Sequence, residues 1–510
     1  MSDYDVIIIG GNSPALVSAA YLYKEGGLKS LILEKSDYIG GAAISTQSIV
    51  PGFTFHPAAT GEYWVDKMLE HDFGITKYGI ESIPAKPKMT ALLGNGKYLS
   101  FYDDLDSTVE EIARFSKKDA DAFKPFMDRW LKVGVFMDMA LTNPAVPFMQ
   151  FVGLMSANPE MEDLLKDMLF GTIKQALDTT FENNSVKTAF LPFMEGSTMG
   201  PATAPFFFTV GRFFAPWGFS KGGLKMIPLA LQKMAETNGT TIRTNSEVGK
   251  ILVKDGKAYG VRLASGEEIL AGNIITNLEP AKTFFDLVGV EHINSNFIEK
   301  IHRINYECMG VTLNLALSGL PDFGIPEEKY HGFIGVVPNF EYAEKAFYEY
   351  TIGEIPEKPC SLGYFGSVID PTFAPAGKHV LTQFVFPVPG KLKNGSWETR
   401  KEELLDNWVD SLVPFAPNIK SLIVGRGGYS PLELEQKFGM TNGDLAHGTI
   451  RWSQQLSWRP MVGYGYNRTP IAGLYMNGQG THPTTPIGGI NGKNAAIAII
   501  EDIKKSKKGK

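Results

Sequence analysis

Cysteine is almost absent from this chain, which has only Cys308 and Cys360 among its 510 residues. Because the two lie far apart and outside any CxxC pattern, the sequence predicts neither a disulfide framework nor a zinc site, and it fits a reducing, cytoplasmic compartment. An excess of basic charge is missing too, since 49 Lys plus Arg face 55 Asp plus Glu, for a formal net charge of −6. Such a balance offers no broad cationic surface to a phosphate backbone and argues against nucleic acid as a partner.

A long apolar run is also lacking. The run from Val6 to Ile9 follows no basic segment and is too short for a signal peptide. The longest uncharged window worth weighing as a membrane span, residues 139–159, contains Pro144 and Pro147, which interrupt it as a membrane-spanning helix. The alternative is peripheral membrane contact, through this window and Phe206-Phe207-Phe208. The basic segment Lys504 to Lys510 is expected to be solvated, with a weak attraction to an anionic surface as its alternative.

The beginning of the chain has the pattern of a β-α-β unit. Asp5 to Ile9 is apolar and β-branched after its first residue, which is typical of a parallel strand buried on both faces. After a glycine-rich break, helical spacing runs from Ala15 to Lys24, with Pro14 suited to the first turn and Gly26-Gly27 to the stop. A second strand follows at Ser30 to Leu33. The unit has the size of a mononucleotide-binding half.

Later segments extend this layer. Strand-like runs at Val248 to Val253, Ala258 to Leu263 and Glu268 to Ile275 suggest a small appended sheet. Near the end, a strand at Gly473 to Asn477 and a helix from Asn494 to Ile503 flank a glycine-rich loop. The predicted fold class is therefore α/β, with a Rossmann-like nucleotide domain of several segments and an inserted mixed α+β substrate domain. We assign residues 1–100, 215–295 and 440–505 to the first, 101–214 and 296–439 to the second, and 506–510 to a basic tail.

Phenylalanine and methionine are concentrated in the middle of the chain. Residues Phe123 to Met226 hold 15 of the 33 Phe and 10 of the 18 Met. Adaptable and bulky apolar side chains suit a pliable cavity, although dense core packing uses the same residues and is the expectation for any single one. The concentration indicates an apolar small-molecule substrate.

The loop after the first strand is a degenerate dinucleotide fingerprint. The three glycine positions of G-x-G-x-x-G hold Gly10, Asn12 and Ala15. Asn12 brings a side chain where only hydrogen is normally accommodated, and we expect it to tolerate positive φ or to donate its amide to phosphate. Glu34 ends the second strand, where an acid accepts hydrogen bonds from ribose hydroxyls. The alternative interpretation of Glu34 is an exposed acid at the end of a strand.

Two further glycine-rich loops are candidates for the same site. Gly40-Gly41 would allow close backbone approach to a diphosphate or flavin ring, with a structural turn as the alternative. Gly478-Gln479-Gly480 and Ile487 to Gly492 precede the last helix. Amides at a helix start carry partial positive charge that stabilises an electron-rich ring carbonyl.

With these motifs, Asp5 to Ala43 resembles the FAD-binding opening of the phytoene desaturase-related flavoproteins, which include carotenoid isomerases and share a two-domain architecture with amine oxidases. The resemblance extends over nearly the whole chain. It is carried further by Asn277 to Pro280, Asp370 to His379, Gly443 to Gly448, Arg459-Pro460, Arg468 to Ile471, Gly473 to Met476, Thr481 to Pro483 and Gly492 to Ala496.

The resemblance implies FAD as the cofactor. The residues that it places along FAD are Gly10, Asn12, Ser13, Pro14, Ala15, Glu34, Lys35, Gly40, Gly41, Ala42, Val248, Gly478, Gln479, Gly488, Gly489 and Ile490. Two departures stand out. The family usually has Asp or a small residue at Gln479, and a run of glycines at Thr484-Thr485-Pro486, which here would bring hydroxyls or a rigid ring close to the flavin.

No second strand-G-x-G-x-x-G-helix segment occurs, so a dedicated NAD(P)H domain is not indicated. The electron acceptor is therefore of another kind, such as oxygen, a quinone or a second organic molecule. His56, His447 and His482 have no metal-binding spacing, and structural hydrogen bonding is expected for each over proton transfer. The linear sequence assigns neither a catalytic base nor an oligomeric state.

The main hypothesis is an FAD-dependent oxidoreductase that desaturates or reduces a C–C bond in an apolar isoprenoid or alicyclic substrate by hydride transfer with flavin N5. One alternative is a redox-neutral isomerase that uses reduced FAD. Another is a non-catalytic binder of prenylated partners, like Rab escort and GDP-dissociation-inhibitor proteins, since Asn12 and Gln479 could signal loss of FAD. Retention of Glu34 and Gly40-Gly41 argues against that binder.

Overall fold

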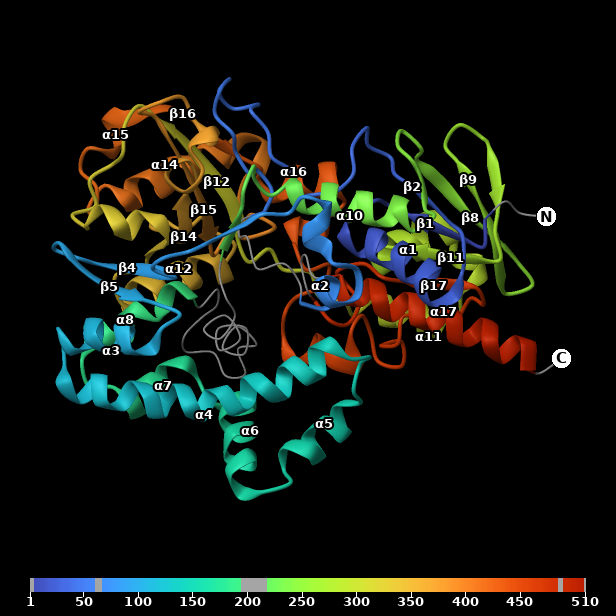
Figure 1. Ribbon diagram of the computed structural model, residues 1–510, viewed down its shortest axis with the longest axis horizontal. Coiled ribbons are helices and arrows are strands. Elements are labelled where there is room, and N and C mark those ends of the chain that lie inside the picture. The colour runs from blue at the N-terminus through green and yellow to red at the C-terminus, as the bar shows by residue number, and fades with distance from the viewer. Residues whose placement is uncertain (1–3, 60–66, 194–217, 485–488, 509–510) are drawn as a thin grey trace.

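The computed structural model describes residues 4–59, 67–193, 218–484 and 489–508. Two large sheets lie side by side along the molecule (Figure 1), and both chain ends are on the side of the parallel sheet. Helices α4 to α7 form a separate layer below the second sheet. Phe206-Phe207-Phe208, expected at a membrane-facing entrance, lie outside the described residues.

The first sheet is parallel, with the strand order β17-β11-β1-β2-β7. Its strands are β1 (Val6–Ile9), β2 (Ser30–Leu33), β7 (Thr241–Arg243), β11 (Asn273–Thr276) and β17 (Leu474–Met476). β1 is central and buried along its whole length, as the sequence predicts. The three separated segments of the chain therefore do meet in one sheet.

Both faces of this sheet are covered, which explains its continuous apolar strands. Val6 and Ile8 pack under α1 (Ser13–Gly26), α10 (Met226–Thr237) and α17 (Ile490–Lys508). Ile7 and Ile9 pack on the other face, against a three-stranded antiparallel sheet of β8 (Val248–Lys254), β9 (Lys257–Leu263) and β10 (Glu268–Leu270). The α1 boundaries follow its predicted signals, with Pro14 in the first turn and Gly27 in the left-handed conformation at the C-cap.

The appended sheet corrects one expectation. The run from Glu268 to Ile275 is not one strand, because β10 pairs with β9 while β11 pairs with β1 in the parallel sheet. Gly272 separates the two strands at the point where the chain crosses from one sheet to the other. At the other end of the chain, α17 begins before the predicted Asn494 and continues to Lys508, so most of the basic segment is helical.

The second large sheet has the order β16-β12-β15-β14-β13-β4-β5 and is antiparallel except where β13 pairs with β4. Its strands are β4 (Met89–Gly94), β5 (Lys97–Phe101), β12 (Val311–Leu317), β13 (Phe333–Val336), β14 (Cys360–Phe365), β15 (His379–Phe386) and β16 (Ile423–Gly428). β4 and β5 thus lie outside the nucleotide domain, to which the sequence analysis assigns residues 1–100. A hairpin of this kind has no local signal for its partner, and Met89 pairs with the distant Phe333.

Alternate residues of the second sheet face two different cores. Val311, Leu313 and Val385 belong to the same hydrophobic core as the buried residues of α14 (Trp397–Leu412) on one side. The opposite face, which includes Tyr364 and Phe384, belongs to the cluster of the Phe- and Met-rich helices. These helices are α3 (Leu105–Ala113), α4 (Lys117–Thr142), α5 (Phe148–Met155), α6 (Pro159–Phe170), α7 (Ile173–Thr180) and α8 (Asn184–Ala189).

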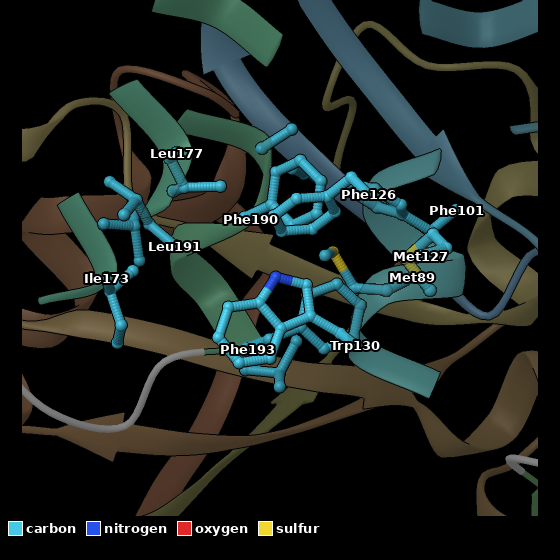
Figure 2. Close-up of a cluster of buried hydrophobic side chains, with 14 of the residues drawn as sticks. Met89, Phe101, Phe126, Met127, Trp130, Ile173, Leu177, Phe190, Leu191 and Phe193 are labelled. Carbon is cyan, nitrogen blue, oxygen red and sulfur yellow. The ribbon is translucent and has the colours of Figure 1, made fainter. Parts of the chain in front are cut away.

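Within this cluster, aromatic rings pack directly against one another (Figure 2). The Phe190 ring centroid lies 5.1 Å from that of Phe101 on β5 and 5.8 Å from that of Phe126 on α4. Phe126 and Phe190 of the rich segment are therefore core residues, as expected, whereas Phe170 at the end of α6 is exposed. The aromatic side chains of this segment pack on one face of the second sheet.

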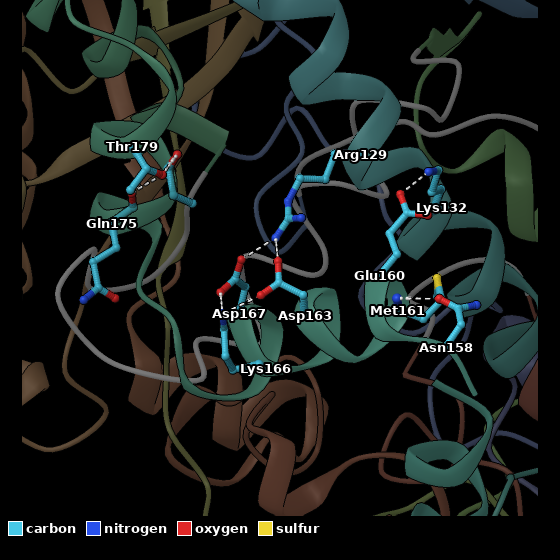
Figure 3. A network of polar contacts seen from close by, with 11 residues as sticks. Arg129, Lys132, Asn158, Glu160, Met161, Asp163, Lys166, Asp167, Gln175 and Thr179 are labelled. Atoms are coloured by element: carbon cyan, nitrogen blue, oxygen red, sulfur yellow. Dashed lines mark hydrogen bonds and ion pairs between the residues drawn. The ribbon is translucent and has the colours of Figure 1, made fainter. Parts of the chain in front are cut away.

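The outer helices are joined by charged contacts. Arg129 on α4 pairs with Asp163 at 3.0 Å and with Asp167 on α6, and Lys132 pairs with Glu160 (Figure 3). The uncharged window 139–159 is divided between the end of α4, a loop with two prolines, and α5. Among the described helices, none combines the length and the apolar character that a membrane span requires.

Candidate functional site

The predicted site residues collect where the parallel strands end. Four loops meet at this edge, following β1, β2, β11 and β17, which is where open α/β sheets bind ligands. The structure places Gly10, Asn12, Ser13, Pro14 and Ala15 after β1, Glu34, Lys35, Gly40, Gly41 and Ala42 after β2, Gly478 and Gln479 after β17, Gly489 and Ile490 at the start of α17, and Val248 at the start of β8. Gly488, Thr485 and Pro486 lie outside the described residues.

The first loop needs glycine at position 10. Gly10 has φ +91°, and a Cβ there would lie 2.3 Å from Oδ1 of Asn277, which follows β11. Asn12 differs from its expectation, because its φ is −82° and it is the N-cap of α1. Its Oδ1 accepts a hydrogen bond from the Ala15 N–H at 3.3 Å. The first amides of a helix have no intrahelical partner, so an asparagine here is stabilised in the extended conformation and does not need positive φ.

Glu34 is buried and is not the exposed strand-end acid of the alternative interpretation. Its Oε2 accepts from the Gly11 N–H at 2.7 Å, and its Oε1 accepts from the Ser36 N–H at 2.8 Å. A carboxylate has about four acceptor positions, so two remain for hydroxyl donors. The Ser246 N–H donates to the Glu34 carbonyl, which brings the start of β8 to the same end of the sheet.

The second glycine loop lies directly on the first. The Gly40 N–H donates to the Gly11 carbonyl at 2.9 Å, and a Cβ at Gly41 would lie 3.4 Å from the Asn12 Cβ. Gly40 has φ +120° and packs against Pro228 of α10, where a Cβ would lie 2.7 Å from the ring. The turn therefore requires glycine, and its backbone lies directly beside the loop after β1.

Asparagines that the sequence analysis missed hold the third loop. Asn491 Nδ2 donates to the carbonyls of Asn477 at 2.8 Å and Gly478 at 3.0 Å. Asn477 Nδ2 in turn donates to Ser18 Oγ at 2.8 Å, which ties the loop to α1. A Cβ at Gly478 would lie 2.2 Å from the Asn277 carbonyl. The asparagines flank the motif glycines, which is the only sequence signal that could have found them.

These residues fit FAD. The loops contain glycines whose Cβ atoms would collide with neighbouring backbone or side chains, and a buried acid with acceptor positions to spare. Two further buried polar atoms, Thr484 Oγ1 and Asn277 Nδ2, have no hydrogen-bond partner within the part of the chain that the structure describes. Buried polar atoms are normally satisfied, so unpaired ones at this edge suit a polar ligand.

Arg459 fixes the chain around Gln479. Its side chain is fully buried and donates to five carbonyl groups, among them those of Gly448 at 2.8 Å and Gln479 at 3.2 Å. Burial lowers the pKa of Arg459 to about 10. Asp444 holds the same turn by accepting from the Ala446 N–H at 2.8 Å and the Glu307 N–H at 3.0 Å. Burial raises the pKa of Asp444 to about 6.

The histidines differ from one another. His56 Nε2 accepts from the Leu224 N–H at 3.2 Å, so its proton is on Nδ1 and is donated to Tyr364 Oη at 2.6 Å. Burial lowers the pKa of His56 to about 4, and the neutral ring joins the nucleotide domain to the second sheet. His447 does not make the expected bond at Nδ1, which is buried without a partner among the described residues. His482 is buried in the loop that follows β17.

Relatives of this chain match it from end to end. Pyridine nucleotide-disulfide oxidoreductase domain-containing protein 2 of Mus musculus is 28% identical and covers 98% of this chain and 94% of its own length. A limonene dehydrogenase subunit of Castellaniella defragrans is 25% identical, with 98% and 95% covered. Phytoene desaturase (lycopene-forming) of Pseudescherichia vulneris is 25% identical, with 98% and 99% covered. The predicted resemblance to phytoene desaturases is confirmed.

Among solved structures, an oxidoreductase from Methanosarcina mazei superposes with a TM-score of 0.59 at 17% identity and covers 97% of this chain and 99% of its own. The predicted α/β fold class is confirmed. The family model of flavin containing amine oxidoreductases matches residues 16–282, more than half of the chain. FAD as cofactor and an oxidoreductase activity are thereby confirmed, and neither the isomerase nor the prenyl-binding alternative is favoured. The chain belongs to the flavin-containing amine oxidoreductase family and is an FAD-dependent oxidoreductase.

Proposed function

We propose that this flavoenzyme desaturates or reduces a C–C bond in an apolar isoprenoid or alicyclic substrate. The observation that carries the proposal is the aromatic face of the second sheet, where Tyr364 and Phe384 pack with the Phe- and Met-rich helices. Support also comes from two relatives named for limonene and phytoene, both isoprenoid hydrocarbons. A wall of aromatic side chains offers such a molecule dispersion contacts and removes its apolar surface from water.

Bound FAD supplies a hydride acceptor or donor at flavin N5. The chain would hold it with residues that the structure brings together. Glu34 would accept hydrogen bonds from ribose hydroxyls, while the N-terminus of α1 and the Gly40-Gly41 backbone would hold the diphosphate. The loop at Gly478 and Gln479, which Arg459 fixes by hydrogen bonds, would support the ring.

The domain junction positions the substrate. His56 stays neutral, and its Nδ1–H orients the Tyr364 hydroxyl on the aromatic face of the second sheet. Aromatic side chains there exclude water, which favours hydride transfer over side reactions. For desaturation, the chain would hold the C–H bond of the substrate close to the flavin, and a base or water would take the neighbouring proton. The electrons would pass to oxygen, a quinone or a second organic molecule.

Product analysis tests the proposal. The FAD-loaded enzyme is incubated with saturated and unsaturated monoterpenes and polyenes, and the products are identified by mass spectrometry. A change of two hydrogens in one compound is the expected result. A positional or geometric isomer of unchanged mass, formed only by the reduced enzyme, would support the isomerase in its place. A protein that neither binds FAD nor gains thermal stability on its addition would overturn both.

The outer helices support peripheral membrane contact as an attribute of this function. Large apolar side chains are exposed along α4 to α6, including Met139 at 58%, Met149 at 75% and Phe170 at 72%. The nearby cations Arg129 and Lys132 are paired with acids, so contact would be made by apolar insertion and not by attraction to anionic lipid (Figure 3). Flotation with neutral liposomes tests this. Substitution Met149→Asp with Phe170→Asp is expected to abolish it, and full recovery of the original protein in the aqueous fraction would refute it.

A further inference from the structure

One buried carboxyl group belongs neither to the predicted FAD contacts nor to the aromatic cluster. Glu279 lies just beyond β11, at the carboxyl end of the parallel sheet, and is 1% exposed. A buried acid is costly unless it is paired or protonated, so its retention at the ligand-binding edge needs an explanation.

Glu279 lies beside the loop that is predicted to run along FAD. A Cβ at Gly478 would lie 2.2 Å from the Asn277 carbonyl, and one at Gly480 would lie 3.7 Å from Pro280 Cδ. The segment 277–280 therefore packs directly against residues 478–480. A charge that appears on the cofactor reaches Glu279 through protein and not through bulk water, so it is weakly screened.

The groups around Glu279 come from three segments of the chain. The Thr441 N–H donates to its Oε1 at 2.8 Å, and the Thr441 hydroxyl donates to its Oε2. Lys282 on η3 (Lys282–Val288) favours the carboxylate, whereas the Asp444 charge opposes it, and Tyr306 also faces the group. Burial outweighs these contacts and raises the pKa of Glu279 to about 7. The group therefore changes charge near neutral pH.

Thr441 provides a contact between Glu279 and a less buried part of the chain. It is only half-buried, lies at the start of η7 (Thr441–Gly443), and donates its hydroxyl to the buried carboxylate. A hydroxyl both donates and accepts, so it can pass a proton between solvent and the buried carboxylate.

We propose that Glu279 takes up one proton from solvent when the bound FAD is reduced and releases it when the FAD is reoxidised. A hydride brings two electrons and one proton, so the cofactor gains one negative charge. The Glu279 carboxylate then binds H⁺ and becomes a neutral carboxylic acid, because a nearby negative charge disfavours its ionised form. Uptake offsets the charge that reduction leaves inside the protein. The inference needs only FAD redox chemistry, so it survives if the proposed substrate class is wrong.

Proton uptake on reduction tests this role. The holoenzyme is reduced electrochemically through a mediator at several pH values, and the dependence of the midpoint potential on pH gives the protons bound per two electrons. The wild type is expected to bind more protons near pH 7 than Glu279→Gln. The matched control is Glu435→Gln, since Glu435 Oε2 accepts from the Asn442 N–H of the same turn at 2.8 Å. Wild-type behaviour is expected of this control. Equal uptake in wild type and Glu279→Gln would overturn the proposal.

A second measurement observes the carboxyl group itself. Reduced-minus-oxidised infrared spectra of the holoenzyme should show a new carboxylic acid C=O band that shifts when glutamate is labelled with ¹³C. The band should vanish in Glu279→Gln and persist in Glu435→Gln. A spectrum without any label-sensitive acid band in the wild type would refute proton uptake by Glu279.

Discussion

The Gly11 N–H donates to Glu34 Oε2 over 2.7 Å, which ties the loop after β1 to the end of β2. One carboxylate thus fixes the turn after β1 and keeps acceptor positions for the ribose that we propose it binds. We predict that Glu34→Ala weakens FAD binding about 10- to 100-fold, because charge-assisted hydrogen bonds are lost. Fluorescence titration of the apoprotein with FAD measures this. The exposed Glu247→Ala is the control, and equal affinity of both variants would contradict the assignment.

Asn12 caps α1, so its removal should act on the helix more than on the cofactor. Asn12→Ala is expected to cost about 1 kcal/mol of unfolding free energy, whereas Asn12→Gly costs only a few tenths. Because Asn12→Gly also restores the usual fingerprint, it should bind FAD at least as tightly as the wild type. Urea denaturation and FAD titration give both quantities. A glycine variant that loses FAD would show that the Asn12 side chain contacts the cofactor.

Gly478 is held between β17 and the chain after β11. A Cβ there would lie 2.2 Å from the Asn277 carbonyl, a backbone atom that cannot move alone. Gly478→Ala should therefore lower the free energy of unfolding by about 2 kcal/mol or more and weaken FAD binding. Gly153→Ala in α5 is the matched control, since nothing lies within 4 Å of its Cβ position. It should be neutral or slightly stabilising, and a similar loss at both sites would contradict the close packing.

Asp72 fastens α2 (Lys67–Phe73) to the first and last helices. Burial opposes its ionisation, but hydrogen bonds from Tyr21 and His71 and the charge of Lys493 outweigh burial and hold the pKa of Asp72 below its usual value. A group with a depressed folded-state pKa stabilises the protein above its unfolded pKa, and this stability is lost as the pH falls below about 4. Melting temperatures between pH 7 and 3 should fall less steeply for Asp72→Asn than for the wild type. Parallel curves would contradict the assigned contacts.

The pKa of Glu279 is shifted in the opposite direction, so its effect on stability has the opposite dependence on pH. Its folded-state pKa of about 7 lies above the ordinary value of 4.5, so the folded state binds the extra proton. Its contribution is fully present below the unfolded pKa and is lost as the pH rises through 7. Wild-type protein should therefore lose on the order of 2 to 3 kcal/mol relative to Glu279→Gln between about pH 4.5 and pH 8. Urea denaturation across this range measures the difference, and a constant gap between the two proteins would refute it.

Local signals were sufficient for the first β-α-β unit. The apolar run of β1, Pro14 at the start of α1 and Gly27 at its end each determine structure through neighbours in the sequence. Local signals did not predict the sheet to which β4 belongs. Its partner strand begins at the distant Phe333, and strand pairing between remote segments leaves no periodic pattern in the sequence.

In the candidate site, too, local signals predicted some residues, while others depend on contacts with remote parts of the chain. Glu34 and the glycines could be assigned from spacing after strands. Glu279 could not be singled out, because its raised pKa depends on burial and on Thr441, which lies far along the chain. The role of Asn12 as the N-cap of α1 was not predicted for another reason, since the fingerprint describes a glycine at that position and gives no sign of a helix cap.

The most direct test of the proposed activity is anaerobic mixing of the oxidised holoenzyme with isoprenoid and alicyclic compounds while the flavin absorption is followed. Saturated members of this series are expected to bleach the flavin and to yield a product with one more double bond, while primary amines leave the spectrum unchanged. Bleaching by amines alone, with every apolar compound inert, would contradict the proposal.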